Sequence, residues 1–412
     1  MITLNPSQAA AKVRIPQVLQ KEEGIILLGS AGMGKSFLLK DIIRSNIFSN
    51  VLVLAETNQA VNLLREDLGH TSATFKTICS ALLYELERTL HGFQLVRRRA
   101  PDWSEFSVVI LDEGSQVPKV RFAEIRQNAR RLIISGDELQ APPVGEKESP
   151  AFNAPFRKVS LTIPMRNDSE IFQYLQKVRA TIGNNKRFPQ DYSQDTKVFE
   201  KGIKAELEAF NNGSAVILAY SEKGKRLSAV TDYNKLIKQE LFGSSELPQV
   251  GERIVFKKPY IPFQDEAKEP KQNKDYPIFT NQRGIITDCT SHTIFFKNHR
   301  IPSWRADFSC LDYPGVKLHG YMPKDEHDPW FQAARTVAFA SGKPAVKEFF
   351  GQWAHFQSSY AVNAYVSQGL SIPKVFVDYR DISACTQEDL LLRQKIFYVC
   401  VSRASEQLSV RV

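Results

Sequence analysis

Short apolar runs recur along the first third of the chain, and polar or amphipathic segments of helical length separate them. The runs are Gly24–Leu28, Val51–Ala55, Val108–Leu111 and Arg131–Ser135. Short runs without polar alternation are typical of parallel strands that are buried on both faces. With helices in the segments between them, the pattern predicts an α/β domain built on a parallel sheet.

A second series of the same kind begins near residue 166. It includes the apolar run Ala215–Ala219, an expected helix at Leu227–Leu241, and the late runs Val375–Asp378 and Leu408–Val412. This repetition predicts a second parallel-sheet domain, which a different type of segment interrupts.

Two segments do not fit the strand and helix rhythm. Residues 246–345 carry many prolines and short alternating stretches, which predicts a small β-rich insert. Residues 85–106 contain three consecutive arginines and are expected to form a small hairpin insert. The predicted division is therefore 1–165 for the first domain, 166–245 with 346–412 for the second, and 246–345 for the β-rich insert.

Composition limits the class of protein. The chain has 412 residues, 42% of them hydrophobic, which is enough for two or three packed cores. Its net charge of +9 permits a polyanionic partner. The five cysteines are scattered without a CxxC pair, so neither a disulfide framework nor a zinc site is expected. No segment reads as a signal peptide or membrane span, and we expect a cytoplasmic protein without a membrane partner.

The segment Gly29–Ser36 matches GxxxxGK[ST] in full, and it lies between a predicted strand and a predicted helix. In this motif the glycines, here Gly29, Gly32 and Gly34, let backbone N–H groups surround phosphate oxygens. Lys35 is expected to reach the β- and γ-phosphates, and the Ser36 hydroxyl to bind Mg²⁺. The motif predicts an ATP site.

Two further segments follow predicted strands at the same edge of the sheet. Asp112 and Glu113 end the third run, where ligands bind in parallel sheets. Asp112 is expected to hold Mg²⁺, and Glu113 to orient or deprotonate the attacking water. The segment Ser135–Pro143 follows the fourth run, and its Gln140 is expected to sense the γ-phosphate.

These motifs, in this order and spacing, resemble those of superfamily 1 helicases, more closely the RecD/Dda-like class that moves 5′ to 3′. The resemblance implies two RecA-like domains, a strand-separating pin at 85–106 and an SH3-like fold for the 246–345 insert. It also implies that Gln8 reads adenine, that Gly369 lies at the nucleotide, and that Arg166 and Arg403 contact the γ-phosphate from the second domain. Arginine suits this role because its charge is permanent and has several donors.

The resemblance places contacts to the nucleic-acid strand on both domains. The expected residues are Thr57, Asn58, Thr74, Lys76, Pro143, Asn363 and Ser367, with Phe93 as the wedge of the pin. Lys76 stands where the family has histidine, and Tyr365 and Val366 depart from its pattern beside Ser367. A solvated basic loop is the alternative for the pin, and a peptide-binding or stabilising module is the alternative for the 246–345 insert.

The predicted function is that of an ATP-dependent DNA helicase that moves along single-stranded DNA and opens forks. Two alternatives remain: a viral-type RNA helicase, and a factor that tracks along a strand and displaces proteins without unwinding. We expect a monomer, with replication or single-strand-binding proteins as further partners.

Overall fold

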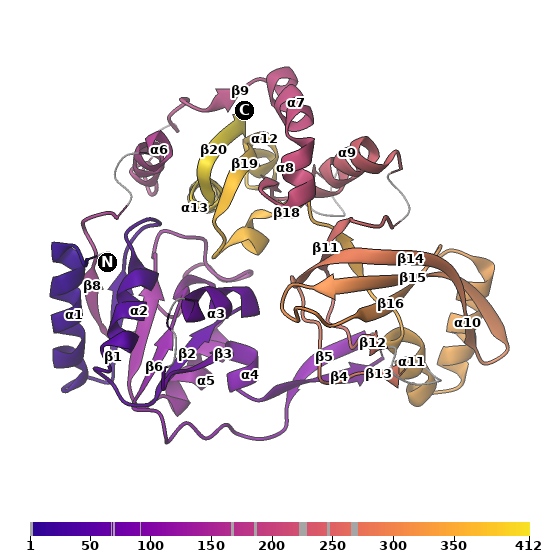
Figure 1. Cartoon of the computed structure of the whole chain (residues 1–412), viewed down its shortest axis with the longest axis horizontal. Coiled ribbons are helices and arrows are strands. Elements are labelled where there is room, and N and C mark those ends of the chain that lie inside the picture. The colour runs from indigo at the N-terminus through magenta and orange to yellow at the C-terminus, as the bar shows by residue number, and fades with distance from the viewer. Residues whose placement is uncertain are drawn as a thin grey trace.

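The computed structural model describes the chain except residues 1–2, 67, 69–70, 91, 166–168, 185–187, 222–228, 245–247 and 265–270. Figure 1 shows three parts: two sheets with helices around them, and a β-rich part beside both. Among the described residues, every helix is too short or too polar to cross a membrane.

The first part is a six-stranded parallel sheet in the order β3-β2-β6-β7-β1-β8. Its strands are β1 (Gly24–Leu28), β2 (Val51–Ala55), β3 (Thr74–Thr77), β6 (Val108–Leu111), β7 (Leu132–Gly136) and β8 (Arg157–Ser160). Its helices are α1 (Pro6–Leu19), α2 (Lys35–Arg44), α3 (Asn58–Arg65), α4 (Ile78–Ala81) and α5 (Lys119–Asn128). Buried apolar side chains fill both faces of the sheet. The four predicted strands are its central ones, whereas the edge strands β3 and β8 are largely unburied and lack an apolar run.

The second part is a five-stranded parallel sheet in the order β18-β10-β19-β20-β9. Its strands are β9 (Ser193–Gln194), β10 (Ala215–Ala219), β18 (Ala361–Asn363), β19 (Ile372–Asp378) and β20 (Ala404–Arg411). Its helices are α6 (Glu170–Arg179), α7 (Thr196–Ala205), α8 (Leu207–Asn212), α9 (Ala229–Phe242), α12 (Tyr379–Cys385) and α13 (Leu390–Val401). The prediction of two parallel-sheet α/β parts is thus confirmed. We call them the first and second units.

The third part, which we call the β module, is a seven-stranded antiparallel sheet in the order β13-β12-β16-β15-β14-β11-β17. Its strands are β11 (Arg253–Phe256), β12 (Phe263–Gln264), β13 (Lys271–Gln272), β14 (Arg283–Phe296), β15 (His299–Cys310), β16 (Leu318–Pro323) and β17 (Phe356–Ser358). Helices α10 (Pro329–Ala340) and α11 (Lys343–Gly351) pack on this sheet. Because β17 pairs with β11, the sheet continues past residue 345, where the predicted insert ended.

The segment expected to be a hairpin forms β4 (Tyr84–Thr89) and β5 (Gly92–Arg97), which pair antiparallel. The hairpin leaves the first unit and reaches the β module beside β12 and α11 (Figure 1). There Leu90 packs against the apolar core under α10 and α11, and Phe93 contacts Tyr260 edge to face at 6.4 Å between ring centroids. The hairpin is therefore held against the β module near its tip.

Candidate functional site

The loop after β1 has the backbone that the phosphate-loop motif requires. Gly32 and Gly34 adopt positive φ angles of 83° and 75°, and α2 begins directly after them. A Cβ on Gly34 would overlap the side chains of Gln8 and Met165. Lys35 is buried, and its Nζ donates to the carbonyl of Gly29 at 2.8 Å. The ammonium group therefore lies inside the loop, where phosphate oxygens would compete for it.

The acidic pair follows β6, which pairs directly with β7 in the sheet. Asp112 is buried, and Glu113 takes a left-handed φ of 51° before the short 3₁₀ helix Gly114–Gln116. Burial first, and then the charge of Glu113, raise the pKa of Asp112 to about 6, while Lys35 acts in the opposite direction. Asp112 Oδ1 and Glu113 Oε2 have no hydrogen-bond partner among the described residues. Unpaired buried carboxylate oxygens are expected where a divalent cation binds.

A cavity of about 610 Å³ joins these groups to the second unit. Ser36, Asp112, Glu113 and Gly369 all line it. Ser36 is exposed in the first turn of α2. Because Ser36 and Asp112 line the same cavity, the hydroxyl and the carboxylate can bind one cation there. Gly369 comes from the second unit and has a φ of 77°. The residues present thus fit a phosphate–metal group between the two units.

Arg403 completes this arrangement from the second unit. It follows α13 and is 4% exposed, and its Nη1 donates to the carbonyl of Leu370 at 3.2 Å. Burial lowers the pKa of Arg403, and the nearby charge of Glu113 is the strongest opposing influence. The carboxylate charge of Glu113 in the first unit therefore acts on Arg403 in the second unit. Arg166 lies outside the described residues.

A buried ion-pair network also joins the units, and the motif analysis missed it. Asp137, at the end of β7, accepts from Arg179 Nη1 at 2.7 Å and from the Tyr398 hydroxyl at 2.5 Å. Arg179 is on α6 and Tyr398 on α13, so both partners belong to the second unit. Nearby, Gln140 is buried and accepts from the Ser115 hydroxyl at 3.1 Å. Only the position of Asp137 beside Gln140 in one motif signalled this network.

Gln8 is fully buried beside the phosphate loop. Its Nε2 donates to the carbonyls of Met33 and Gly34 at 3.3 and 3.2 Å, and its Oε1 accepts from the Asn5 backbone at 2.9 Å. In this structure Gln8 thus caps α1 and supports the loop, because both ends of its amide are bonded within the protein. The expected contact with adenine stays a prediction.

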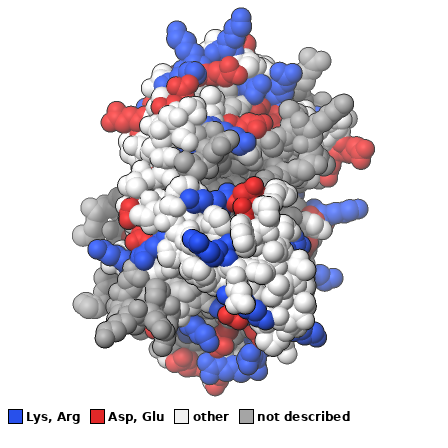
Figure 2. Space-filling model, turned by 90° about the vertical axis from the view of Figure 1, so that its right-hand side faces the viewer, with Lys and Arg blue, Asp and Glu red and all other residues white. Residues whose placement is uncertain are grey.

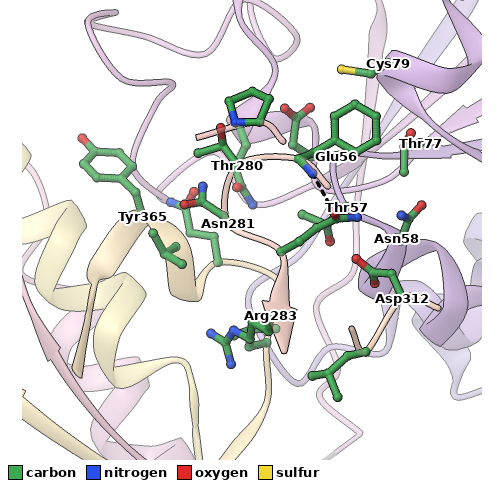
Figure 3. A pocket seen from close by; sticks show the side chains of 18 of the residues that line it. Glu56, Thr57, Asn58, Thr77, Cys79, Thr280, Asn281, Arg283, Asp312 and Tyr365 are labelled. Atoms are coloured by element: carbon green, nitrogen blue, oxygen red, sulfur yellow. Dashed lines mark hydrogen bonds between the residues drawn. The ribbon is translucent and has the colours of Figure 1, made fainter. Parts of the chain in front are cut away.

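A second cavity, of about 240 Å³, lies where the first unit, the hairpin, the β module and the second unit meet (Figure 3). We call it the strand cavity. Residues from four separate segments line it: Glu56, Thr57, Asn58, Thr77, Cys79, Leu95, Gln116, Arg121, Pro259, Phe279, Thr280, Asn281, Gln282, Arg283, Leu311, Asp312, Tyr365, Val366, Gln368 and Leu370.

The strand contacts predicted in the first unit lie at or near this cavity. Asn58 lines it together with Asp312 of the β module, and its side chain lowers the pKa of the Asp312 carboxyl against the effect of burial. Thr57 also lines it, and its hydroxyl caps α3 by accepting from the Ala60 backbone at 3.2 Å. Thr74 and Lys76 are on the edge strand β3, outside the cavity lining, with Lys76 exposed.

Four contacts predicted elsewhere have other surroundings. Ser367 is fully buried and donates to the Ala364 carbonyl at 2.7 Å, so its hydroxyl is unavailable to a strand. Pro143 is also buried, so its ring is not exposed to a strand as predicted. Asn363 caps the 3₁₀ helix Ala364–Ser367 and donates to the Tyr220 carbonyl. Phe93 lines a different cavity, between the hairpin and the β module, which corrects the picture of a free wedge.

The charged groups of the strand cavity are mostly paired. Glu56 and Arg121 form an ion pair at 2.7 Å, and burial raises the pKa of Glu56. Burial likewise raises the pKa of Asp312, against the opposing influence of the Gln282 and Asn58 side chains. On the face of the β module in Figure 2, basic and acidic side chains are interspersed. No sequence motif pointed to Asp312.

Comparisons with known proteins agree with this geometry. A family model described as an AAA domain matches residues 3–180. ATP-dependent DNA helicase Pif1 of Bdellovibrio bacteriovorus is 26% identical over 50% of this chain and 52% of its own length, so the chain spans about half of that relative. The protein of the same name from Campylobacter jejuni is 21% identical over 95% of this chain and 88% of its own length.

Solved structures show the same fold. Bacteroides Pif1 bound to single-stranded DNA superposes with a TM-score of 0.52 at 14% identity, covering 100% of this chain and 92% of that one. A Pif1 structure on unwinding at forked double-stranded DNA gives a TM-score of 0.51 at 15% identity with the same coverage. The two parallel-sheet units are thus RecA-like. With the phosphate loop and the acidic pair at one cleft, the chain is similar to Pif1 helicases in sequence over 95% of its length and in its fold.

Proposed function

We propose that this protein is an ATP-dependent helicase that moves along single-stranded DNA in the 5′ to 3′ direction and unwinds forked duplexes. One observation carries the proposal: Ser36, Asp112 and Glu113 of the first unit and Gly369 of the second unit line one cavity beside the phosphate loop, and the charge of Glu113 acts on Arg403. A site whose groups come from two units is complete only when those units close on the nucleotide. The activity of the relatives, ATP-dependent DNA helicase, supports the same reaction here.

The groups of the nucleotide cleft suit ATP hydrolysis. Bound Mg²⁺ would supply charge neutralisation at the phosphates, and Ser36 with Asp112 would hold it. Lys35 would stabilise the β- and γ-phosphate oxygens from inside the loop. Glu113 would orient the attacking water and accept its proton, for which its unpaired Oε2 is available.

The second unit would supply charge as the γ-phosphoryl group leaves. Arg403 would stabilise the negative charge that spreads over the γ-phosphoryl oxygens, and we assign Arg166 the same role. Gln140 would transmit the presence of the γ-phosphate to Ser115, whose hydroxyl it already accepts from. The Asp137 network would transmit closure to α6 and α13. This coupling between nucleotide state and unit position is what a motor requires.

The proposal is tested by measuring ATP hydrolysis with and without single-stranded DNA or RNA oligomers, for wild type and Lys35→Ala. We expect DNA to stimulate the wild type, and Lys35→Ala to lose about 100-fold or more of the rate, as for removal of a preorganised charge donor. Unwinding of forks with a single 5′ or 3′ tail then gives polarity. Stimulation by RNA alone would mean that the substrate strand is RNA and not DNA. Stimulation by neither polymer would contradict the proposed motor function.

A second function is favoured by the position of Phe93. Because its ring packs on Tyr260, the hairpin presents the strand with a supported surface and not a free aromatic wedge. A factor that displaces bound proteins from a strand needs movement but no wedge. Rates of fork unwinding and of protein displacement, measured on the same strand, separate the two functions.

A further inference from the structure

The cavity of the nucleotide cleft continues beyond the groups that hold the phosphates and the cation. From Ser36, Asp112 and Glu113 it runs on between α2 and α3, which lie side by side in the first unit (Figure 1). We call this continuation the α2–α3 groove, and its lining consists of Phe37, Lys40, Arg44, Ala60, Leu63, Leu64 and Glu66. Arg44, Leu63 and Glu66 are exposed, so the groove connects the cleft with the surface of the first unit.

The groove is larger than the bound nucleotide requires. Within the loop Gly29–Ser36, which should hold the triphosphate, Ser36 is the residue that lines the cavity. Gln8, where the adenine is expected, contacts the carbonyls of Met33 and Gly34 and does not line the cavity. The base is therefore expected elsewhere, which leaves the groove to water or to a product of the reaction.

The groove would stay open when the two units close. Its walls come from α2 and α3, which belong to one unit and pack together. The second unit contributes Gly369, which lines the cavity with the acidic pair. Closure on the nucleotide would narrow the cleft between the units, but it would not move α2 relative to α3. A product formed in the closed state could therefore leave through the groove.

The charges along the groove favour the departure of an anion. Ser36, Lys40 and Arg44 are four residues apart, so they share one face of α2 and follow each other at intervals of about 6 Å along its axis. An inorganic phosphate released at the acidic pair would be repelled by Glu113 and attracted first by Lys40 and then by Arg44.

The remaining lining suits passage better than tight binding. Phe37, Ala60, Leu63 and Leu64 have apolar side chains, which offer an anion no hydrogen bonds. Glu66 at the C-cap of α3 adds a negative charge to the lining and would oppose a stable anion site there. Such a lining would guide phosphate outward without retaining it.

We propose that the α2–α3 groove is the exit route of inorganic phosphate after ATP cleavage, and that Lys40 and Arg44 speed its release. This inference rests on the proposed function and adds a later step to it. Lys40 and Arg44 act on the departing product, whereas Lys35 and Glu113 act on the bond that is cleaved.

The test separates cleavage from release in a single turnover with saturating oligothymidine. Chemical quenching measures cleavage, and a fluorescent phosphate-sensing protein measures release. In the double variant Lys40→Gln with Arg44→Gln we expect wild-type cleavage and release slowed by about tenfold, since focusing by local charge changes rates by that order or more. Arg65→Gln, at an exposed arginine of α3 outside the cavity lining, should leave both rates as in wild type.

A second pair of variants changes the width of the groove and not its charge. Leu63 lines the groove and is 42% exposed, whereas its neighbour Asn62 is exposed and lies outside the lining. Leu63→Trp should slow release and keep cleavage unchanged, because the larger side chain narrows the opening. Asn62→Trp adds a comparable bulk on the same helix and should change neither rate.

Four results would overturn the exit route. Release that still coincides with cleavage in the double variant, at the wild-type melting temperature, would mean that the two cations do not act on the product. An equal slowing of cleavage and release would assign them to hydrolysis itself. Equal effects in Arg65→Gln would indicate general surface charge, and unchanged release in Leu63→Trp would place the exit elsewhere. If the wild type cleaves no ATP in the presence of the strand, the proposed function fails, and the cleavage measurement alone reveals this.

Discussion

The nucleotide cleft and the strand cavity both lie between separate parts of the chain, but they differ in how their polar groups are satisfied. Among the described residues, Asp112 and Glu113 of the cleft keep carboxylate oxygens without partners, and the Lys35 ammonium donates to backbone carbonyls. In the strand cavity, Glu56 is paired with Arg121 through its Oε1, and its Oε2 alone lacks a described partner.

This difference matches two kinds of ligand. A cleft that must bind a small ion and a triphosphate in one geometry benefits from groups held ready and unpaired. A cavity through which a strand must move benefits from contacts that exchange easily, because each step breaks and remakes them. Groups that pair with one another in the absence of a strand lower the net gain from each contact.

The largest expected effect tests whether the cleft needs charge from both units. Arg403→Ala should lower the DNA-stimulated rate of ATP hydrolysis about 1000-fold, since an arginine finger contributes on that order or more. Nucleotide affinity, measured with a fluorescent analogue, should change far less. Arg380→Ala, at an exposed arginine of the same unit, is the control. A rate within tenfold of wild type, in a variant that keeps the wild-type melting temperature, would mean that Arg403 takes no part in hydrolysis. The cleft would then not need charge from both units.

A smaller effect tests whether unpaired groups in the cleft cost stability. The pKa of the Asp112 carboxyl is about 6 in the folded protein against a usual 3.8, so the folded state holds its proton more tightly than the unfolded chain does. The resulting penalty is absent below pH 3.8, grows up to about pH 6 and is complete above it. Asp112→Asn should therefore stabilise the protein at pH 8 by about 1–3 kcal/mol without nucleotide or metal, while abolishing hydrolysis.

Thermal unfolding at pH 8 and pH 5 measures this effect. The gain should be larger at pH 8, and Asp275→Asn, at an exposed aspartate of the β module, should show none. A variant that is less stable than wild type at pH 8 would mean that Asp112 is already satisfied, and the contrast between the two sites would disappear.

The smallest expected effect tests the internal pairing of the strand cavity. Asp312→Ala removes a negative charge from the cavity, and should strengthen strand binding by roughly fivefold, or about 1 kcal/mol. Because burial raises the pKa of Asp312, wild-type affinity should also rise as the pH falls toward that raised value and the carboxylate is neutralised. The variant should lack this part of the pH dependence.

Anisotropy titrations from pH 8 to pH 5 provide the measurement. Asp288→Ala, an equal change of charge at an exposed position in the same module, should leave both affinity and pH profile as in wild type. If Asp312→Ala weakens binding, the Asp312 carboxylate supports the strand site and does not oppose the strand.

Elements with a strong local signal could be predicted from the sequence. The central strands of the first sheet are short apolar runs because both faces are buried, and β1 and β6 end directly before residues of the nucleotide cleft. Edge strands such as β3 and β8 carry no such run, because solvent covers much of them. The predicted end of the insert at residue 345 falls short of β17, because β17 joins the sheet only by pairing with the distant strand β11.

The sequence by itself determined the phosphate loop, the acidic pair and the two-sheet architecture, because each depends on contiguous residues and on the direction of parallel strands. Only the tertiary structure decided which side chains face the strand cavity. Ser367 and Pro143 are buried, whereas Asp312 lines the cavity from the predicted β-rich insert, at a position to which the motif analysis assigned no role. The physical reason is that a loop after a strand is positioned locally, whereas a cavity among four segments depends on how those segments pack.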